Sequence, residues 1–271
     1  MELSPSAVSF ACDGSLLAQV DREGLQVLYN LDLNVWPNQP FGSVMDVTPM
    51  PGKSKQVLVS CDSFDSSRRL IIQDLPAQGS RSSRLPALSE ETFSLSKSKV
   101  DQVWFPSDEQ RQIHAWVVKP PYINPKQKYP LLYIIHGGPQ HSWGECWDLH
   151  CYLALSPSTA ISSWRPWAGK PYSDLERSLN YICQSLEYVD TERAVALGLG
   201  YGGYMVNWMQ GHDLGRRFRA LIADNGTFNM LSHLANNTQD SIFHGMGGSP
   251  WLNPEAWRKW DHAQFAGRRH A

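Results

Sequence analysis

The chain has 271 residues, 42% hydrophobic and 18% charged, so it is long enough for two domains and apolar enough to bury a core. A formal net charge of −2 argues against a nucleic-acid-binding or membrane-surface protein. No apolar run approaches the ~20 residues of a membrane span, no signal peptide is visible at the N-terminus, and five widely spaced cysteines exclude a disulfide-scaffolded mini-protein.

The first hundred residues read as short β-segments joined by turns. Apolar or β-branched runs are separated by turn-forming pairs such as Asp13-Gly14 and Pro51-Gly52. The predicted strands are 16–20, 25–30, 56–60 and 70–74. We expect part of an all-β repeat array, with one or two blades of a β-propeller.

From about residue 101 the pattern changes to alternating strands and helices. A capping box at Ser173 to Glu176, followed by leucines and isoleucine at helical spacing, predicts a helix that begins there. The predicted strands are 113–118, 131–135, 194–199 and 219–223, and a further helix is expected over 204–210. Alternation of this kind is typical of a doubly wound, mostly parallel α/β sheet.

The segment between the strand 194–199 and the next helix carries the most informative motif. In α/β-hydrolases this junction is the nucleophile elbow, G-x-S-x-G, whose turn is too tight for side chains at the flanks. Gly198 and Gly202 occupy the two flanks, and Gly200 occupies the central position. Glycine has no atom that attacks a carbonyl, so the sequence keeps the elbow but lacks its nucleophile.

A second glycine motif, His136-Gly137-Gly138-Pro139, follows the buried strand 131–135. Backbone N–H groups of such a loop supply half of an oxyanion hole, a role that the sequence places at Gly138. The second donor is expected to be the N–H of Tyr201, the residue after the nucleophile position.

With both motifs in this order, the sequence resembles the prolyl oligopeptidase family of serine peptidases. The resembling segments are 104–120, 128–147, 169–182, 188–221 and 253–261. The resemblance implies a partial β-propeller at residues 1–100 and an incomplete α/β-hydrolase domain at residues 101–271. It also implies a Ser-Asp-His triad that removes dipeptides from the N-termini of peptides.

The sequence departs from the family pattern at the positions of the catalytic triad. The family's serine aligns with Gly200, and its Asp and His belong to loops later than Ala271. A substitute set of Asp224, His212 and His233 is not favoured, because Asp224 is not at the family's acid position and a triad needs a nucleophile.

We therefore expect a truncated serine peptidase that is catalytically inactive as written. The alternatives are a pseudoenzyme that binds peptides or a partner, and the product of a decayed or wrongly predicted gene. A peptide is the expected substrate or ligand, and no cofactor, nucleic acid or membrane partner is expected. The family is secreted, but without a visible signal peptide the compartment stays open.

A cluster of His and Cys residues and two Asn-x-Thr sequons are not expected to be functional sites. A cluster of histidine and cysteine side chains matches no common zinc spacing and is not expected to bind metal; its members are His141, Cys146, His150 and Cys151. The sequons at Asn225 and Asn236 are read as turn residues.

Overall fold

A computed structural model gives the fold of the chain. It describes residues 5–22, 24–30, 34–35, 42–53, 56–64, 66–75, 82–84, 99–107, 112–119, 123–124, 126–138, 144–145, 167–235 and 239–268. The chain divides into two compact units: Met1–Lys99 with Trp143–Tyr152, and Val100–Ser142 with Leu153–Ala271.

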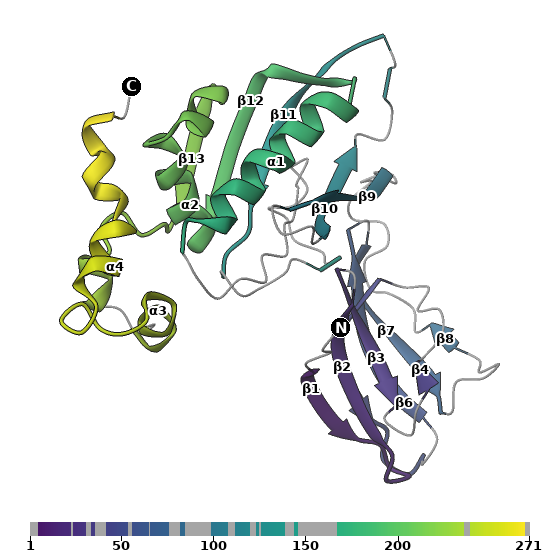
Figure 1. Cartoon of the computed structure of the whole chain (residues 1–271). Helices are drawn as coiled ribbons and strands as arrows, with labels where there is room; N and C mark the ends of the chain where they lie inside the picture. The colour runs from purple at the N-terminus through teal and green to yellow at the C-terminus, as the bar shows by residue number, and fades with distance from the viewer. Residues whose placement is uncertain are drawn as a thin grey trace. The chain divides into compact units, whose positions relative to one another are not determined.

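The described residues of the first unit form two four-stranded sheets (Figure 1). The first sheet contains β1 (Pro5–Phe10), β2 (Leu16–Arg22), β3 (Leu25–Asn30) and β4 (Asn34–Val35), in that order. The second contains β5 (Ser43–Pro49), β6 (Gln56–Ser63), β7 (Ser66–Asp74) and β8 (Ser82–Arg84), also in chain order. All neighbouring strands pair antiparallel, which is the arrangement of a propeller blade.

The two sheets share one apolar core. Leu17 and Leu28 of the first sheet cluster with Val44, Val47 and Val57 of the second, and all five are buried. Neither sheet encloses these side chains alone, because a single sheet covers them on one side only. The sheets therefore fold as a pair.

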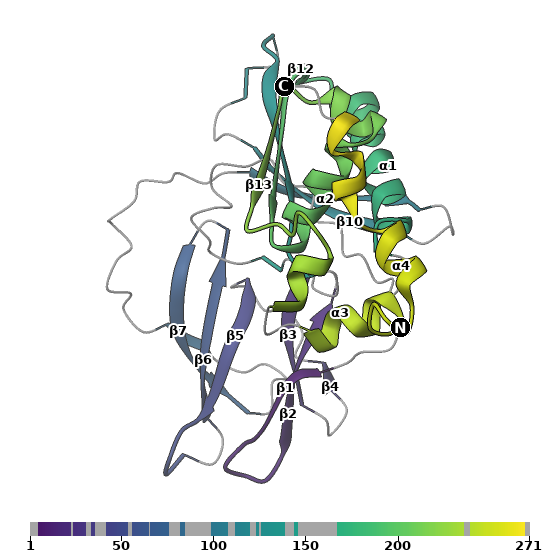
Figure 2. The ribbon, with the colours of Figure 1, turned by 90° about the vertical axis from the view of Figure 1, so that its left-hand side faces the viewer.

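The second unit holds a parallel sheet, a separate strand pair and all the helices of the described residues (Figures 1 and 2). Its strands are β9 (Lys99–Pro106), β10 (Gln112–Lys119), β11 (Tyr129–Ile135), β12 (Val189–Leu199) and β13 (Ala220–Asp224). Its α-helices are α1 (Lys170–Ser185), α2 (Tyr201–Gln210), α3 (Gln239–Met246) and α4 (Pro254–Lys259). Three 3₁₀-helices are η2 (Asp213–Arg217), η3 (Leu231–Ala235) and η4 (His262–Arg268).

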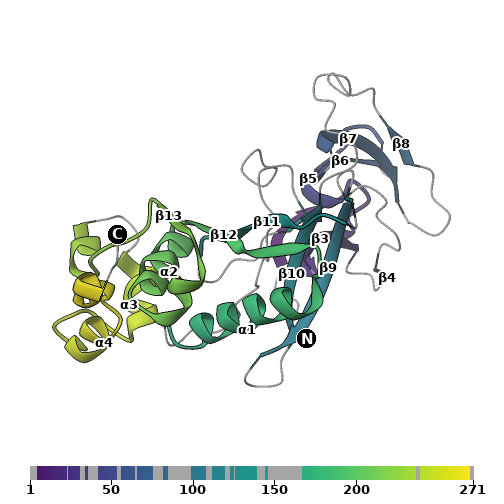
Figure 3. The ribbon, with the colours of Figure 1, turned by 90° about the horizontal axis from the view of Figure 1, so that it is seen from above.

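The parallel sheet has the order β11-β12-β13, with β12 in the centre. Ile135 pairs with Gly198, and Gly198 pairs with Ala223, so the carboxyl ends of all three strands lie at one edge. Helices α1 and α2 lie on the same face of this sheet (Figures 2 and 3). The buried core between them includes Tyr133, Leu175 and Met205. The fold is that of an α/β-hydrolase, with its helices on a parallel sheet.

Two helix starts differ from the sequence-based predictions. Helix α1 begins at Lys170 with Gly169 before it, so the predicted capping box at Ser173 lies inside the helix. Pro171 explains the earlier start, because its fixed φ suits the first turn of a helix. Helix α2 begins at Tyr201 and not at residue 204, so two glycines predicted as turn residues are helical.

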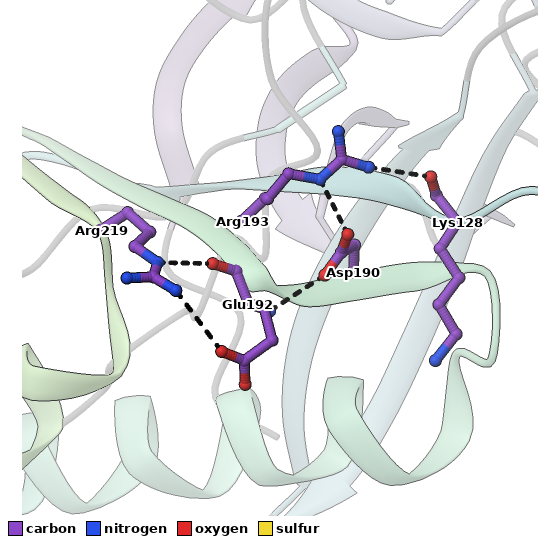
Figure 4. A network of polar contacts seen from close by, with 5 residues as sticks. All are labelled: Lys128, Asp190, Glu192, Arg193 and Arg219. Atoms are coloured by element: carbon purple, nitrogen blue, oxygen red, sulfur yellow. Dashed lines mark hydrogen bonds and ion pairs between the residues drawn. The ribbon is translucent and has the colours of Figure 1, made fainter.

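A polar network joins the amino ends of the three parallel strands (Figure 4). Arg193 Nε donates to Asp190 Oδ2 at 2.7 Å, and Arg193 Nη2 donates to the Lys128 carbonyl oxygen at 3.2 Å. Arg219 Nε donates to the Glu192 carbonyl oxygen at 2.9 Å. The side chains of Glu192, Arg193 and Arg219 are largely exposed, whereas Asp190 is partly buried. The network lies at the amino ends of the strands, opposite to their carboxyl ends.

Candidate active site

Gly200 lies between the end of β12 and the start of α2, with φ 57° and ψ −112°. Its amide donates to the Asp224 carbonyl oxygen at 2.9 Å, and its carbonyl oxygen accepts from the Tyr204 amide at 3.0 Å. A Cβ built on Gly200 meets nothing within 4 Å. The position therefore has room for a side chain, although its positive φ strains any residue other than glycine.

The flanking glycines are held by close backbone contacts. A Cβ on Gly198 would lie 2.1 Å from the Gly202 carbonyl oxygen, and one on Gly202 would lie 2.0 Å from the Ile135 carbonyl oxygen. Both distances are far below van der Waals contact. The turn thus excludes side chains at its flanks and accepts one at its centre.

A second glycine contact anchors the same turn to the end of β13. A Cβ on Gly203 would lie 2.7 Å from Gly226 Cα, and one on Gly226 would lie 2.4 Å from the Gly203 carbonyl carbon. Sequence reasoning missed this contact, because the two glycines are 23 positions apart. The sequence offered only a weak signal, since Gly203 lies four positions after the predicted strand 194–199 and Gly226 lies three positions after the predicted strand 219–223.

The loop 136–138 runs beside this turn. A Cβ on Gly137 would lie 3.3 Å from the Leu199 carbonyl oxygen, and Gly138 has φ 134°. The His136 side chain is buried. Residue 139 of the motif lies outside the described residues. The two glycine motifs are therefore neighbours at the carboxyl ends of β11 and β12.

The backbone and the side chain of Tyr201 have different surroundings. As the first residue of α2, it has a backbone N–H without an intrahelical acceptor. Its buried hydroxyl donates to the Trp167 carbonyl oxygen, and burial raises the pKa of this phenol far above its usual value. The side chain therefore supports the turn, while the backbone N–H has no acceptor within the helix.

The residues of the possible substitute triad, Asp224, His212 and His233, are not brought together at residue 200. His212 lies beyond the C-terminal end of the ten-residue α2, roughly 15 Å along the helix axis from Gly200. His233 Nδ1 is 2.8 Å from Thr227 Oγ1, and burial lowers the pKa of its imidazole. Asp224 has an exposed side chain. These contacts do not assemble a triad around residue 200.

Within the described residues, no group of three or more His, Cys, Asp or Glu side chains is placed to hold a metal ion. The four residues of the predicted His/Cys cluster lie outside the described ranges. Among the helices described, none is both long and apolar enough to span a bilayer.

Comparison with known proteins agrees with this geometry. Residues 161–269 match the prolyl oligopeptidase family. Dipeptidyl-peptidase 5 of Schizosaccharomyces pombe is 39% identical over 199 residues, which are 66% of this chain and 29% of that protein. Probable dipeptidyl-peptidase 5 of Arthroderma benhamiae is 29% identical over 287 residues, covering 95% of this chain and 39% of its own length.

Solved structures show the same fold. An acylaminoacyl peptidase of Pyrococcus horikoshii superposes with a TM-score of 0.83 and 18% identity. The superposition covers 100% of this chain and 45% of the peptidase chain. Prolyl oligopeptidase B from Galerina marginata superposes with a TM-score of 0.75 and 14% identity, and the superposition covers 96% of this chain and 40% of the oligopeptidase chain. The fold is thus the α/β-hydrolase and β-propeller architecture of such peptidases.

The matched segment of this chain belongs to the prolyl oligopeptidase family. The relatives named above are dipeptidyl-peptidases 5, and the chain spans between 29% and 39% of their lengths.

Proposed function

We propose that this chain is a peptide-binding protein of the dipeptidyl-peptidase type that does not cleave peptides by acyl transfer. The observation that carries the proposal is that a glycine, Gly200, occupies the centre of the elbow, with φ 57° and ψ −112°. This residue has no side chain that could act as a nucleophile. Acyl transfer needs an attacking oxygen or sulfur at that point.

The peptide-binding part of the proposal is supported by the backbone that remains. Gly138 and Tyr201 lie at the ends of neighbouring strands, where N–H groups bind a carbonyl oxygen in hydrolases of this fold. Relatives in this fold bind peptides: an acylaminoacyl peptidase was solved with Z-Gly-Gly-Phe-chloromethyl ketone, and prolyl oligopeptidase B with a 35mer substrate. A peptide backbone is therefore the ligand that the site suits best.

The test measures binding and cleavage on the same samples. Fluorescent peptides with a free N-terminus are titrated into the 271-residue protein by polarisation, and the mixtures are then analysed by mass spectrometry for released dipeptides. We expect saturable binding and intact peptides. Dipeptide release by the unchanged protein would contradict the catalytic half of the proposal, and the absence of saturable binding would contradict the other half.

Gly200→Ser provides a matched variant, because open space surrounds the position of its Cβ. A serine hydroxyl without a neighbouring base is a weak nucleophile. We expect no dipeptidyl-peptidase activity and no labelling by a fluorophosphonate from the 271-residue variant. Robust labelling would show that a base already lies within reach of residue 200.

A further inference from the structure

The turn after β13 has an unusual conformation for its residue type. Asn225 has φ 50°, and it is the one residue other than glycine with positive φ in the described part of the chain. Asparagine tolerates this left-handed region better than most residues do. Its side chain is exposed to solvent.

The residue after Asn225 has no side chain that would hinder the approach of its backbone nitrogen to the Asn225 carboxamide. Gly226 has no Cβ, and Asn225-Gly226 is the one Asn-Gly pair in the 271 residues. Among the contacts of the described residues, neither the Asn225 carboxamide nor the Gly226 amide takes part in a hydrogen bond. No hydrogen bond among the described residues therefore holds the attacking nitrogen or the carboxamide that it would attack.

We propose that Asn225 is a site of spontaneous deamidation. The Gly226 backbone nitrogen loses its proton and attacks Cγ of Asn225, forming a carbon–nitrogen bond that closes a five-membered succinimide. The bond from Cγ to the side-chain nitrogen breaks, and that nitrogen leaves as ammonia with the proton. Water then opens the ring at one of its two carbonyls, giving aspartate or isoaspartate. No oxidant, reductant or enzyme is required.

The isoaspartate product matters here because of where the turn lies. It routes the main chain through the former side chain and so adds one methylene to the backbone. Gly226 is packed against Gly203 with no space for a methyl group. The neighbouring Asp224 carbonyl oxygen accepts from the Gly200 amide at 2.9 Å. Conversion at residue 225 is therefore expected to loosen the contact between β13 and the elbow.

Ageing of the 271-residue protein tests the proposal. The folded protein and a synthetic peptide of residues 221–230 are incubated at mildly alkaline pH, and residue 225 is followed by peptide mapping and isoaspartyl methyltransferase labelling. We expect conversion at Asn225 within about tenfold of the rate in the peptide, because exposed turns open at little cost in free energy. The other asparagines of the described ranges should convert far more slowly.

Two variants separate the deamidation reaction from its effect on the melting temperature. Asn225→Gly keeps the positive φ and removes the reacting carboxamide, so its melting temperature should not change on ageing. Asn225→Asp, measured fresh, adds the charge without lengthening the backbone, and it should melt close to the fresh parent. The aged parent should melt at a lower temperature than either variant.

Three results would overturn the inference. A folded-state rate more than about a hundredfold below the peptide rate would show that the turn protects the asparagine. Equal conversion at other asparagines would remove the special role of this turn. An isoaspartate-containing sample that melts like fresh protein would refute the predicted effect on the elbow.

Discussion

Three glycines of the elbow are needed for different physical reasons. Gly198 and Gly202 are needed for space, since a Cβ at either would overlap backbone atoms. Gly200 has open space but a positive φ. The identity of the side chain at residue 200 is therefore separable from the backbone turn that surrounds it.

A matched pair of alanine substitutions tests this separation. Gly200→Ala should cost about 1–3 kcal/mol of unfolding free energy from backbone strain alone. Gly202→Ala should cost more than that, because the Ile135 carbonyl oxygen 2.0 Å from the new Cβ is main chain and cannot move aside. Urea unfolding of both variants provides the measurement. Equal losses would show that the flanking contact relaxes easily.

His114 on β10 is a buried histidine between two tryptophans. Its ring lies 4.6 Å from Trp104 and 4.9 Å from Trp116, measured between centroids. Burial lowers its pKa from 6.5 to about 4. Between pH 6.5 and about 4 the unfolded chain therefore binds more protons than the folded chain at this residue.

This difference predicts an acid-sensitive stability. The contribution of neutral His114 is present above pH 6.5 and is lost as the pH falls toward 4, by up to about 3 kcal/mol. His114→Phe keeps an aromatic ring and should flatten this part of the pH profile, measured by urea unfolding at several pH values. A residual slope is expected from His233, whose pKa is also lowered by burial. Identical profiles for parent and variant would contradict the assignment.

At the scale of elements, Asp261 connects the C-terminal segment to the loop after β13. Its Oδ2 accepts from Asn229 Nδ2 at 3.1 Å, and its Oδ1 accepts from the backbone amides of Met230 and Ala263 at 3.3 and 3.2 Å. Tyr204 of α2 adds a bond from its hydroxyl to the Trp260 carbonyl oxygen at 2.8 Å. The Asp261 carboxylate thus links the C-terminal segment to the loop after β13, and the Tyr204 hydroxyl links the same segment to α2.

Removing this carboxylate should be costly. Asp261→Ala leaves three donors without their acceptor and should lower the unfolding free energy by about 2–4 kcal/mol. Glu192→Ala is a suitable control, because the Glu192 carboxylate lies 3.7 Å from Arg219 and both side chains are largely exposed (Figure 4). The control should change stability by less than about 1 kcal/mol. Similar losses in the two variants would show that Asp261 does not act as a link.

At the scale of the whole molecule, the parallel sheet is covered unevenly. On the face toward α1 and α2, Leu131, Tyr133 and Ala196 are buried. On the opposite face Leu197 is only partly buried, and Ile222 is 48% exposed. No described strand pairs with the outer side of β13. Parallel sheets normally bury both faces, and an open edge favours pairing with other chains.

The 271-residue protein is therefore expected to self-associate as its concentration rises. Ile222→Lys places a charge on the open face at the edge strand and should shift the protein toward monomer in sedimentation velocity experiments. Phe10→Lys on β1 is the matched control, because Phe10 is also exposed, at 69%, but lies in the other unit. A parent protein that remains monomeric at high concentration would refute the prediction.

The sequence alone determined those features that depend on neighbours in the chain. Apolar runs and turn pairs predicted strands in both units, and the spacing of glycines between a strand and a helix located the elbow. The α/β-hydrolase fold was predicted correctly. The start of α1 was wrong, because a capping pattern at Ser173 was given more weight than Pro171.

Only the tertiary structure decided the features that join distant residues. The contact between Gly203 and Gly226, the bonds from Asn229 and Met230 to Asp261, and the shared core of the two sheets each connect positions far apart in the sequence. Periodicity and propensity act over about one turn of helix or a few residues of strand, so they contain no information on which distant partners meet. Sequence therefore specified the elbow as a motif, while packing against β11 and β13 decided which of its glycines can accept a side chain.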